Sequence, residues 1–298
     1  MSENKIPFRQ RMEFEYGKSK QVTPLVRRLV ARNPSSFTFH GTNTYIIGHG
    51  NVAIIDPGPL LNEHTNALVK TLEGETVEHI LVTHTHMDHS PGVTPLKNLL
   101  GGEVHGAMPR EIPNGAQTAE SIQYDFKPDN VLLNGSIING EGWSLEAIYT
   151  PGHMSNHMCF ALPEENVLFT GDHIMSWNTT IVSPPDGNMG EYFSSLDTCL
   201  ARSDKSYWPA HGPSIPNPQP FTRAYRNHRR MRESEILKCL DNGHYTIPDI
   251  VGILYKHLPE KLHGAASRSV LAHLEYLIET ERVTQNDKSE ETTKYRIV

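Results

Sequence analysis

Cysteine is scarce in this sequence, and none of it is paired. Cys159, Cys199 and Cys239 lie far apart and form no C-x-x-C pair. This spacing disfavours both a disulfide framework and a zinc knuckle built on cysteines, and it is typical of a reducing compartment.

Long apolar segments are also missing. No apolar run approaches the ~20 residues that cross a bilayer, and residues 1–20 contain no apolar core of a secretory signal. We therefore expect a cytoplasmic protein with no membrane partner. With 37% hydrophobic and 20% charged residues, the composition is that of a globular protein.

Histidine, in contrast, is abundant. The chain has 17 histidines and a net charge of −7, with the excess negative charge confined to residues 33–222. The two ends, residues 1–32 and 223–298, are net positive. A polyanion bound at these ends and solvated faces of unequal charge explain this distribution equally well.

The chain divides into an α/β part and a helical part. From residue 37 to about residue 220, short apolar strands alternate with helices, which predicts a layered α/β body. Beyond the proline-rich residues 211–220, three helical segments precede a hairpin, the order of a winged helix. We place a catalytic domain at residues 1–221 and a winged-helix-like domain at 222–298.

Candidate metal ligands follow the ends of several predicted strands. Because His84 and His86 are two residues apart on extended backbone, their side chains point to the same side. Further imidazoles and carboxylates follow at four points of the chain: Asp88 and His89, His153, Asp172, and His211. Five imidazoles and two carboxylates without a thiolate suit two zinc ions and tolerate manganese or iron.

Four motifs in this order resemble the metallo-β-lactamase superfamily: THTHMDH, TPGH, TGD and AHGP. The resemblance covers roughly residues 22–220. The GTNTY and IDPG motifs and the helical tail resemble, more narrowly, the branch that contains the animal mitochondrial β-lactamase-like endoribonuclease. The implied fold is a four-layer αββα sandwich, followed here by a winged-helix domain.

The resemblance also implies a role for each ligand. It assigns His84, His86 and His153 to a first metal. It assigns Asp88, His89 and His211 to a second metal, with Asp172 bridging the two. Flavodiiron relatives usually carry glutamate at the position of His86, so the histidine favours zinc.

The implied reaction is hydrolysis by a hydroxide that bridges the two metals. Asp88 would be the catalytic residue that passes a proton to the leaving group. Asp56 resembles the acid that orients a ligand in this family, although a turn at a strand end explains it equally well.

Four further residues are candidates for substrate binding. His157 and Asn43 lie near the ligand motifs, where structural roles are the alternative. Arg226 and Arg230 belong to an arginine stripe on a predicted helix that would track phosphates or face solvent and pair with acidic residues.

The substrate is left open between two classes. Export signals and large insertions are missing, which disfavours antibiotic-degrading and β-CASP nuclease functions. Single-stranded RNA cleavage is slightly favoured by the narrower resemblance and the arginine stripe. Hydrolysis of a small thioester or ester, as in glyoxalase II relatives, is the alternative.

A non-enzymatic interpretation comes from the helical tail, which would make the chain a winged-helix nucleic-acid-binding protein. The predicted recognition helix offers Arg268 but also three glutamates. Duplex DNA is therefore not the expected partner. We expect the tail to form a wall of the cleft or a contact in a homodimer.

Overall fold

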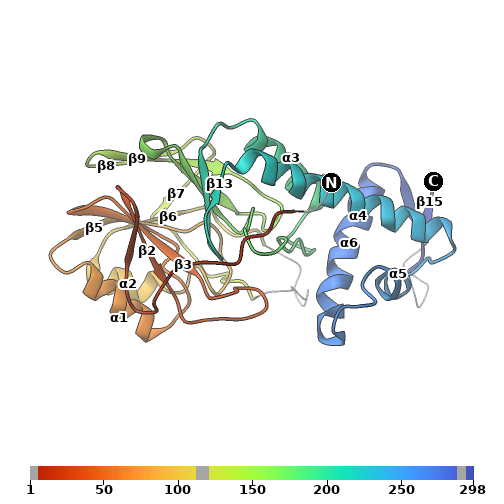
Figure 1. The fold of residues 1–298 in the computed structure, drawn as a ribbon, viewed down its shortest axis with the longest axis horizontal. Helices are drawn as coiled ribbons and strands as arrows, with labels where there is room; N and C mark the ends of the chain where they lie inside the picture. The colour runs from red at the N-terminus through yellow and green to blue at the C-terminus, as the bar shows by residue number, and fades with distance from the viewer. Residues whose placement is uncertain (1–5, 112–120, 287–292) are drawn as a thin grey trace.

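The computed structural model describes residues 6–111, 121–286 and 293–298. Two β-sheets face each other and helices cover both outer faces, while a helical unit adjoins one end of the sandwich (Figure 1). This arrangement confirms the predicted αββα sandwich with a C-terminal winged-helix domain.

The elements fall into three groups. The first sheet runs in chain order: β1 (Lys20–Thr23), β2 (Val26–Val30), β3 (Asn43–Ile47), β4 (Asn51–Ile55), β5 (Thr76–Leu81), β6 (Glu103–Gly106) and β7 (Asn130–Val131). The second sheet has the spatial order β13 (Ile215–Pro216), β12 (Ser206–Pro209), β11 (Val167–Gly171), β10 (Met158–Leu162), β9 (Trp143–Tyr149) and β8 (Ile137–Gly140). The helices and the tail hairpin are α1 (Asn62–Thr71), α2 (Val93–Leu100), α3 (Met189–Leu200), α4 (Pro218–Asp241), α5 (Ile247–Leu254), α6 (His263–Glu279), β14 (Val283–Gln285) and β15 (Tyr295–Ile297).

Alternation of side chains along the strands builds the layers. On β3, Tyr45 and Ile47 point into the core between the two sheets. Ile46, between them, packs with Leu68 of α1 and Leu96 of α2 on the outer face. Because both faces are covered, β3 and β4 are apolar at consecutive positions.

Helix α4 joins the sandwich to the tail (Figure 1). Its first half contributes Phe221 and Tyr225 to the core beneath α3. Its second half contributes Ile236 and Leu240 to the core of the helical tail. The boundary predicted after residue 221 therefore lies inside a continuous helix that both cores share. The proline-rich stretch forms β13 and then the start of this helix, where Pro218 fits the first helical position.

Strand direction brings the candidate ligands to one edge. Strand β5 is parallel to β4 and β6, and β11 is parallel to β12, so their carboxyl ends meet at that edge. Asn43 fastens the two sheets there. Its Nδ2 donates to the carbonyl oxygens of Pro209, at 2.9 Å, and Gly212, at 3.0 Å.

The structure gives Asn43 a structural role at this position, and its contact with substrate stays a prediction. The residue is 0% exposed, and its amide is used between the sheets.

In the described part of the chain, no helix combines the length and the apolarity needed to span a membrane.

Candidate metal and active site

All seven predicted ligands gather at the edge where the two sheets meet. They form overlapping groups that could hold metal ions: His84 with His86 and His153, Asp88 with His89 and His211, and Asp172 with His84 and His89. Each ligand follows a strand end, where the backbone leaves the sheet and several side chains can converge on one point.

The first group consists of imidazoles alone. His86 Nδ1 lies 3.0 Å from His84 Nε2 and 3.1 Å from His153 Nε2. All three residues are buried. Three buried ring nitrogens this close together form the kind of cluster that binds a transition metal.

The second group mixes imidazole with carboxylate. Asp88 Oδ2 lies 3.2 Å from His211 Nε2 and 3.4 Å from His89 Nε2. The Asp88 side chain is 25% exposed, whereas those of the two histidines are buried. Asp88 is therefore the member of this group that solvent or a substrate reaches most easily.

Asp172 lies between the two groups. Its Oδ2 is 3.4 Å from His211 Nε2, 3.7 Å from His89 Nε2 and 3.8 Å from His153 Nε2. One carboxylate oxygen thus faces ligands of both clusters, as a bridging ligand must.

Hydrogen bonds behind the ligands fix the orientation of their rings. Asp56 Oδ2 lies 2.9 Å from His89 Nδ1, while its two oxygens also accept from the backbone N–H and the hydroxyl of Thr83. His153 Nδ1 donates to the Ile181 carbonyl at 2.6 Å. Because Nδ1 of His89 and of His153 is engaged, Nε2 of each ring points toward the clusters. Hydrogen bonds of this kind orient the imidazole ligands of metal sites.

The charges of the site favour a cation. Burial alone would raise the pKa of Asp172, yet His211 and His89 hold it well below its usual value. Burial alone would lower the pKa of His211, yet Asp172 and Asp88 raise it to about 10. The two carboxylates thus favour positive charge at this point, whether imidazolium or a metal cation carries it.

The buried polar atoms test whether a metal fits. His89 Nε2 and Asp172 Oδ1 are buried and have no hydrogen-bond partner among the residues that the structure describes. Buried ring nitrogens and carboxylate oxygens rarely lack a hydrogen-bond partner in folded proteins. A bound metal ion would be a partner for both atoms. The donor set of imidazole and carboxylate fits a divalent transition metal such as zinc, manganese or iron.

His157 stands behind the site. It is 0% exposed, and its Nε2 accepts a hydrogen bond from the Asp172 backbone N–H at 3.1 Å. Its Nδ1 is bonded to the Thr150 hydroxyl at 2.9 Å. His157 thus contacts the backbone of Asp172, and its contact with substrate stays a prediction.

Two threonines beside the ligands were not predicted as site residues. The Thr83 hydroxyl is hydrogen-bonded to both Asp56 and His84, and the Thr42 hydroxyl donates to Asp88 Oδ2 at 3.3 Å. Both threonines lie inside motifs already singled out, THTHMDH and GTNTY. Thr83 directly precedes His84 in the sequence, whereas Thr42 lies 46 residues before Asp88 and only its motif indicated it.

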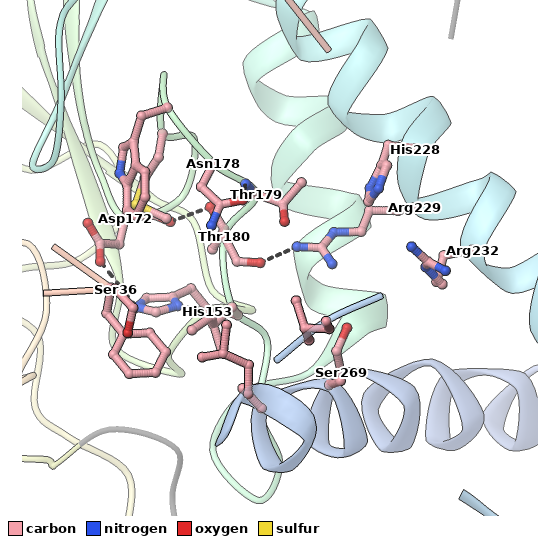
Figure 2. Close-up of a pocket in the computed structure, with 18 of the residues that line it drawn as sticks. Ser36, His153, Asp172, Asn178, Thr179, Thr180, His228, Arg229, Arg232 and Ser269 are labelled. Carbon is pink, nitrogen blue, oxygen red and sulfur yellow. Dashed lines mark hydrogen bonds and ion pairs between the residues drawn. The ribbon is translucent and has the colours of Figure 1, made fainter. Parts of the chain in front are cut away.

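A pocket of about 250 Å³ opens beside the ligands (Figure 2). His153 and Asp172 line one end, and the pocket extends toward α4 and α6. Trp177, Leu258 and Ala266 are among its apolar walls. The segment between α5 and α6 thus closes a space next to the metal-ligand clusters.

The arginines of this pocket are not those predicted. Arg229 and Arg232 line it. Arg226 instead pairs with Asp197 of α3 at 2.7 Å, and Arg230 pairs with Glu233 at 3.1 Å. Substrate binding by Arg226 and Arg230 stays a prediction.

With fold and site described, the class of the protein follows. Residues 37–211 match the metallo-beta-lactamase superfamily, and residues 246–292 match the beta-lactamase associated winged helix domain. The chain belongs to the metallo-beta-lactamase superfamily and carries this winged-helix domain at its C-terminal end. It is accordingly a hydrolase with clusters of histidine and aspartate suited to metal binding.

Two fungal relatives illustrate the membership. The chain is 30% identical over 263 residues to the lactamase-like protein adaB of Aspergillus niger, which covers 83% of this chain and 78% of the relative. It is 31% identical over 245 residues to the atrochrysone carboxyl ACP thioesterase of Claviceps purpurea, which covers 79% and 74% respectively. The narrower resemblance to the animal endoribonuclease branch stays a prediction.

Two solved structures are similar in fold over nearly the whole chain. A metallo-beta-lactamase family protein from Thermus thermophilus has a TM-score of 0.76 at 22% identity, covering 93% of this chain and 100% of that one. A beta-lactamase domain protein from Burkholderia ambifaria has a TM-score of 0.78 at 17% identity, covering 95% and 94%. The shared architecture includes the tail.

The contact between Asp56 and His89 leads to a first prediction. In Asp56→Asn the amide can no longer serve both Thr83 and the His89 ring as a carboxylate does. We expect metal affinity to fall by roughly 10- to 100-fold, the usual effect of losing such support. Competition with a chromogenic chelator measures it. Unchanged affinity would contradict an orienting role.

Proposed function

We propose that this chain hydrolyses small acyl thioesters in a metal-dependent reaction, with zinc as the resident metal. The observation that carries the proposal is the pocket beside His153 and Asp172, whose walls combine apolar side chains with a few polar groups. An apolar pocket with a few polar groups at one end suits a small acyl chain. The fungal relatives named as ACP thioesterases support the same class of substrate.

The ligand clusters explain the chemistry. Two bound divalent cations would polarise the thioester carbonyl and make a water molecule nucleophilic near neutral pH. The imidazoles and Asp172 would hold these cations. Hydrogen bonds that His89 and His153 donate to Asp56 and to the Ile181 carbonyl fix these two imidazoles, so little reorganisation is needed during the reaction.

Asp88 is the residue best placed to move a proton. Burial alone would raise its pKa, but His89 and His211 hold the pKa well below the usual value, so the carboxylate stays ionised. Its partial exposure allows it to accept the proton that the attacking water loses. It would then return this proton to the thiolate as the C–S bond breaks.

Cleavage of single-stranded RNA is the competing substrate class. The sequence favoured it through the stripe that includes Arg226 and Arg230, but both residues already form ion pairs, Arg226 with Asp197 and Arg230 with Glu233. An extended RNA strand also does not need a pocket of about 250 Å³ beside the ligands. The thioester is therefore the better-supported substrate.

The experiment compares three substrates with one metal-loaded preparation. Zinc-loaded protein is assayed on a butyryl thioester of N-acetylcysteamine, on the matching oxygen ester and on a labelled single-stranded RNA. We expect release of thiol, with kcat lowered roughly 10²- to 10⁴-fold in Asp88→Asn, the range of a lost proton-transfer group. Asp241→Asn, at the exposed end of α4, serves as the matched control.

Each outcome has a clear meaning. Thioester turnover that Asp88→Asn abolishes and Asp241→Asn retains supports the proposal. Metal-replete protein that cleaves RNA but releases no thiol would replace it with endoribonuclease activity.

A further inference from the structure

Arg229 is a buried arginine in the wall of the pocket (Figure 2). The residue is 3% exposed. Its Nη2 donates to the Thr180 carbonyl, and its guanidinium carbon lies 5.2 Å from the centre of the Tyr192 ring. Its Nε has no hydrogen-bond partner within the part of the chain that the structure describes. No carboxylate among the described residues lies within ion-pair distance of it.

The neighbouring arginines of α4 differ in this respect. Arg226 pairs with Asp197, and Arg232 pairs with Glu235 at 2.9 Å. Arg229 alone of these three is both buried and without an acidic partner among the described residues. A guanidinium does not lose its proton in proteins, so the pocket contains a full positive charge.

The other basic groups nearby add little charge of their own, because Arg232 is paired with Glu235 and His228 is neutral near pH 7. Arg232 lines the same pocket, and burial together with Arg229 and Arg232 lowers the pKa of His228 to about 4. Burying a charge without a counter-charge costs free energy. An anion that enters the pocket would supply the counter-charge that Arg229 lacks. The planar fork of a guanidinium matches a carboxylate or a phosphate in two hydrogen bonds.

We propose that Arg229 binds an anionic group of the substrate, a carboxylate or a phosphate, while the scissile bond lies at the metal-ligand clusters. This inference rests on the proposed thioesterase function and specifies its substrate. The pocket runs from Asp172 to Arg229, so the anionic group is the part of the substrate remote from the reacting carbonyl. The volume of about 250 Å³ favours a carboxylate at the end of a short acyl chain over a bulkier phosphate ester.

Three thioesters distinguish the two sources of negative charge. The butyryl thioester of N-acetylcysteamine is neutral, the glutaryl thioester carries a carboxylate on its acyl chain, and butyryl-coenzyme A carries phosphates on its thiol. We expect the glutaryl thioester to exceed the butyryl one in kcat/KM by roughly 10- to 100-fold. A preference for the coenzyme A thioester instead would assign the anion to the thiol carrier.

Variants of Arg229 test the residue itself. In Arg229→Gln, which keeps a donor for the Thr180 carbonyl, the ratio of kcat/KM values between acidic and neutral thioesters should fall close to one. Arg229→Lys keeps the charge without the fork and should retain part of the ratio. Arg223→Gln, an exposed position on the same helix, should leave the ratio unchanged.

A binding measurement separates this inference from the proposed function. Titration calorimetry with free glutarate should show binding to the metal-loaded protein that weakens by roughly 10-fold or more in Arg229→Gln. If no thioester is hydrolysed but glutarate binds through Arg229, the anion site stands and the proposed function fails. Equal turnover of acidic and neutral thioesters, with glutarate binding unaffected in Arg229→Gln, would overturn the anion site alone.

Discussion

Replacing Asp172 with alanine is expected to abolish hydrolysis and release metal from both clusters. Its Oδ2 faces His153, His89 and His211 at 3.4–3.8 Å, so its loss removes the negative charge on which both clusters depend. Metal catalysis contributes several kcal/mol to transition-state stabilisation, which predicts a loss of about 10³-fold or more in kcat/KM.

Metal content per chain after dialysis, together with thioester turnover, measures this effect. Asp197→Ala is the matched control, because this aspartate pairs with Arg226 at the surface of α3. It should change neither quantity, since exposed ion pairs contribute only about 0–1 kcal/mol. An Asp172→Ala protein that keeps its full metal content and activity would refute the bridging role.

Replacing Gly152 with alanine is expected to destabilise the fold strongly and to disturb the site. Gly152 has a φ of +129°, and a Cβ at this position would lie 2.4 Å from the backbone nitrogen of Tyr192. The clash is with the backbone of α3, so no side-chain rotation relieves it. Overpacking and backbone strain together predict a loss of about 3 kcal/mol or more in the free energy of unfolding.

The same substitution should impair the site, because Gly152 immediately precedes His153. Any shift that relieves the clash moves this imidazole away from His86. Thermal unfolding and metal affinity measure the two effects. Gly135→Ala is the matched control: its φ is +81° but nothing lies within 4 Å of the added Cβ. It should cost only the ~1–2 kcal/mol of a left-handed alanine. Equal losses in the two variants would show that the contact with α3 is unimportant.

The metal-ligand clusters were predictable because their information is local. His84 and His86 share a short motif, and the other ligands follow recognisable strand ends. Position along the chain therefore specified position at the edge of the sandwich. The layers were predictable for a similar reason, since apolar runs such as that of β3 indicate strands covered on both faces.

The pocket was less predictable, because its residues are selected by packing between distant segments. A helical stripe indicates which arginines lie near one another, but not which face of α4 meets α3. Arg226 forms an ion pair with Asp197, while Arg229, three residues further on, donates a hydrogen bond to the Thr180 carbonyl. Asn43 is another example, since its partners Pro209 and Gly212 lie more than 160 residues away in the sequence.

The continuous course of α4 bears on how this architecture can evolve. The pocket is walled by the sandwich on one side and by the tail on the other, and one helix belongs to both cores. A tail inherited from a different relative would bring new pocket walls together with a new hydrophobic surface for α4. Changes of specificity and changes of domain packing are thereby coupled, so the two domains are expected to diversify as a pair.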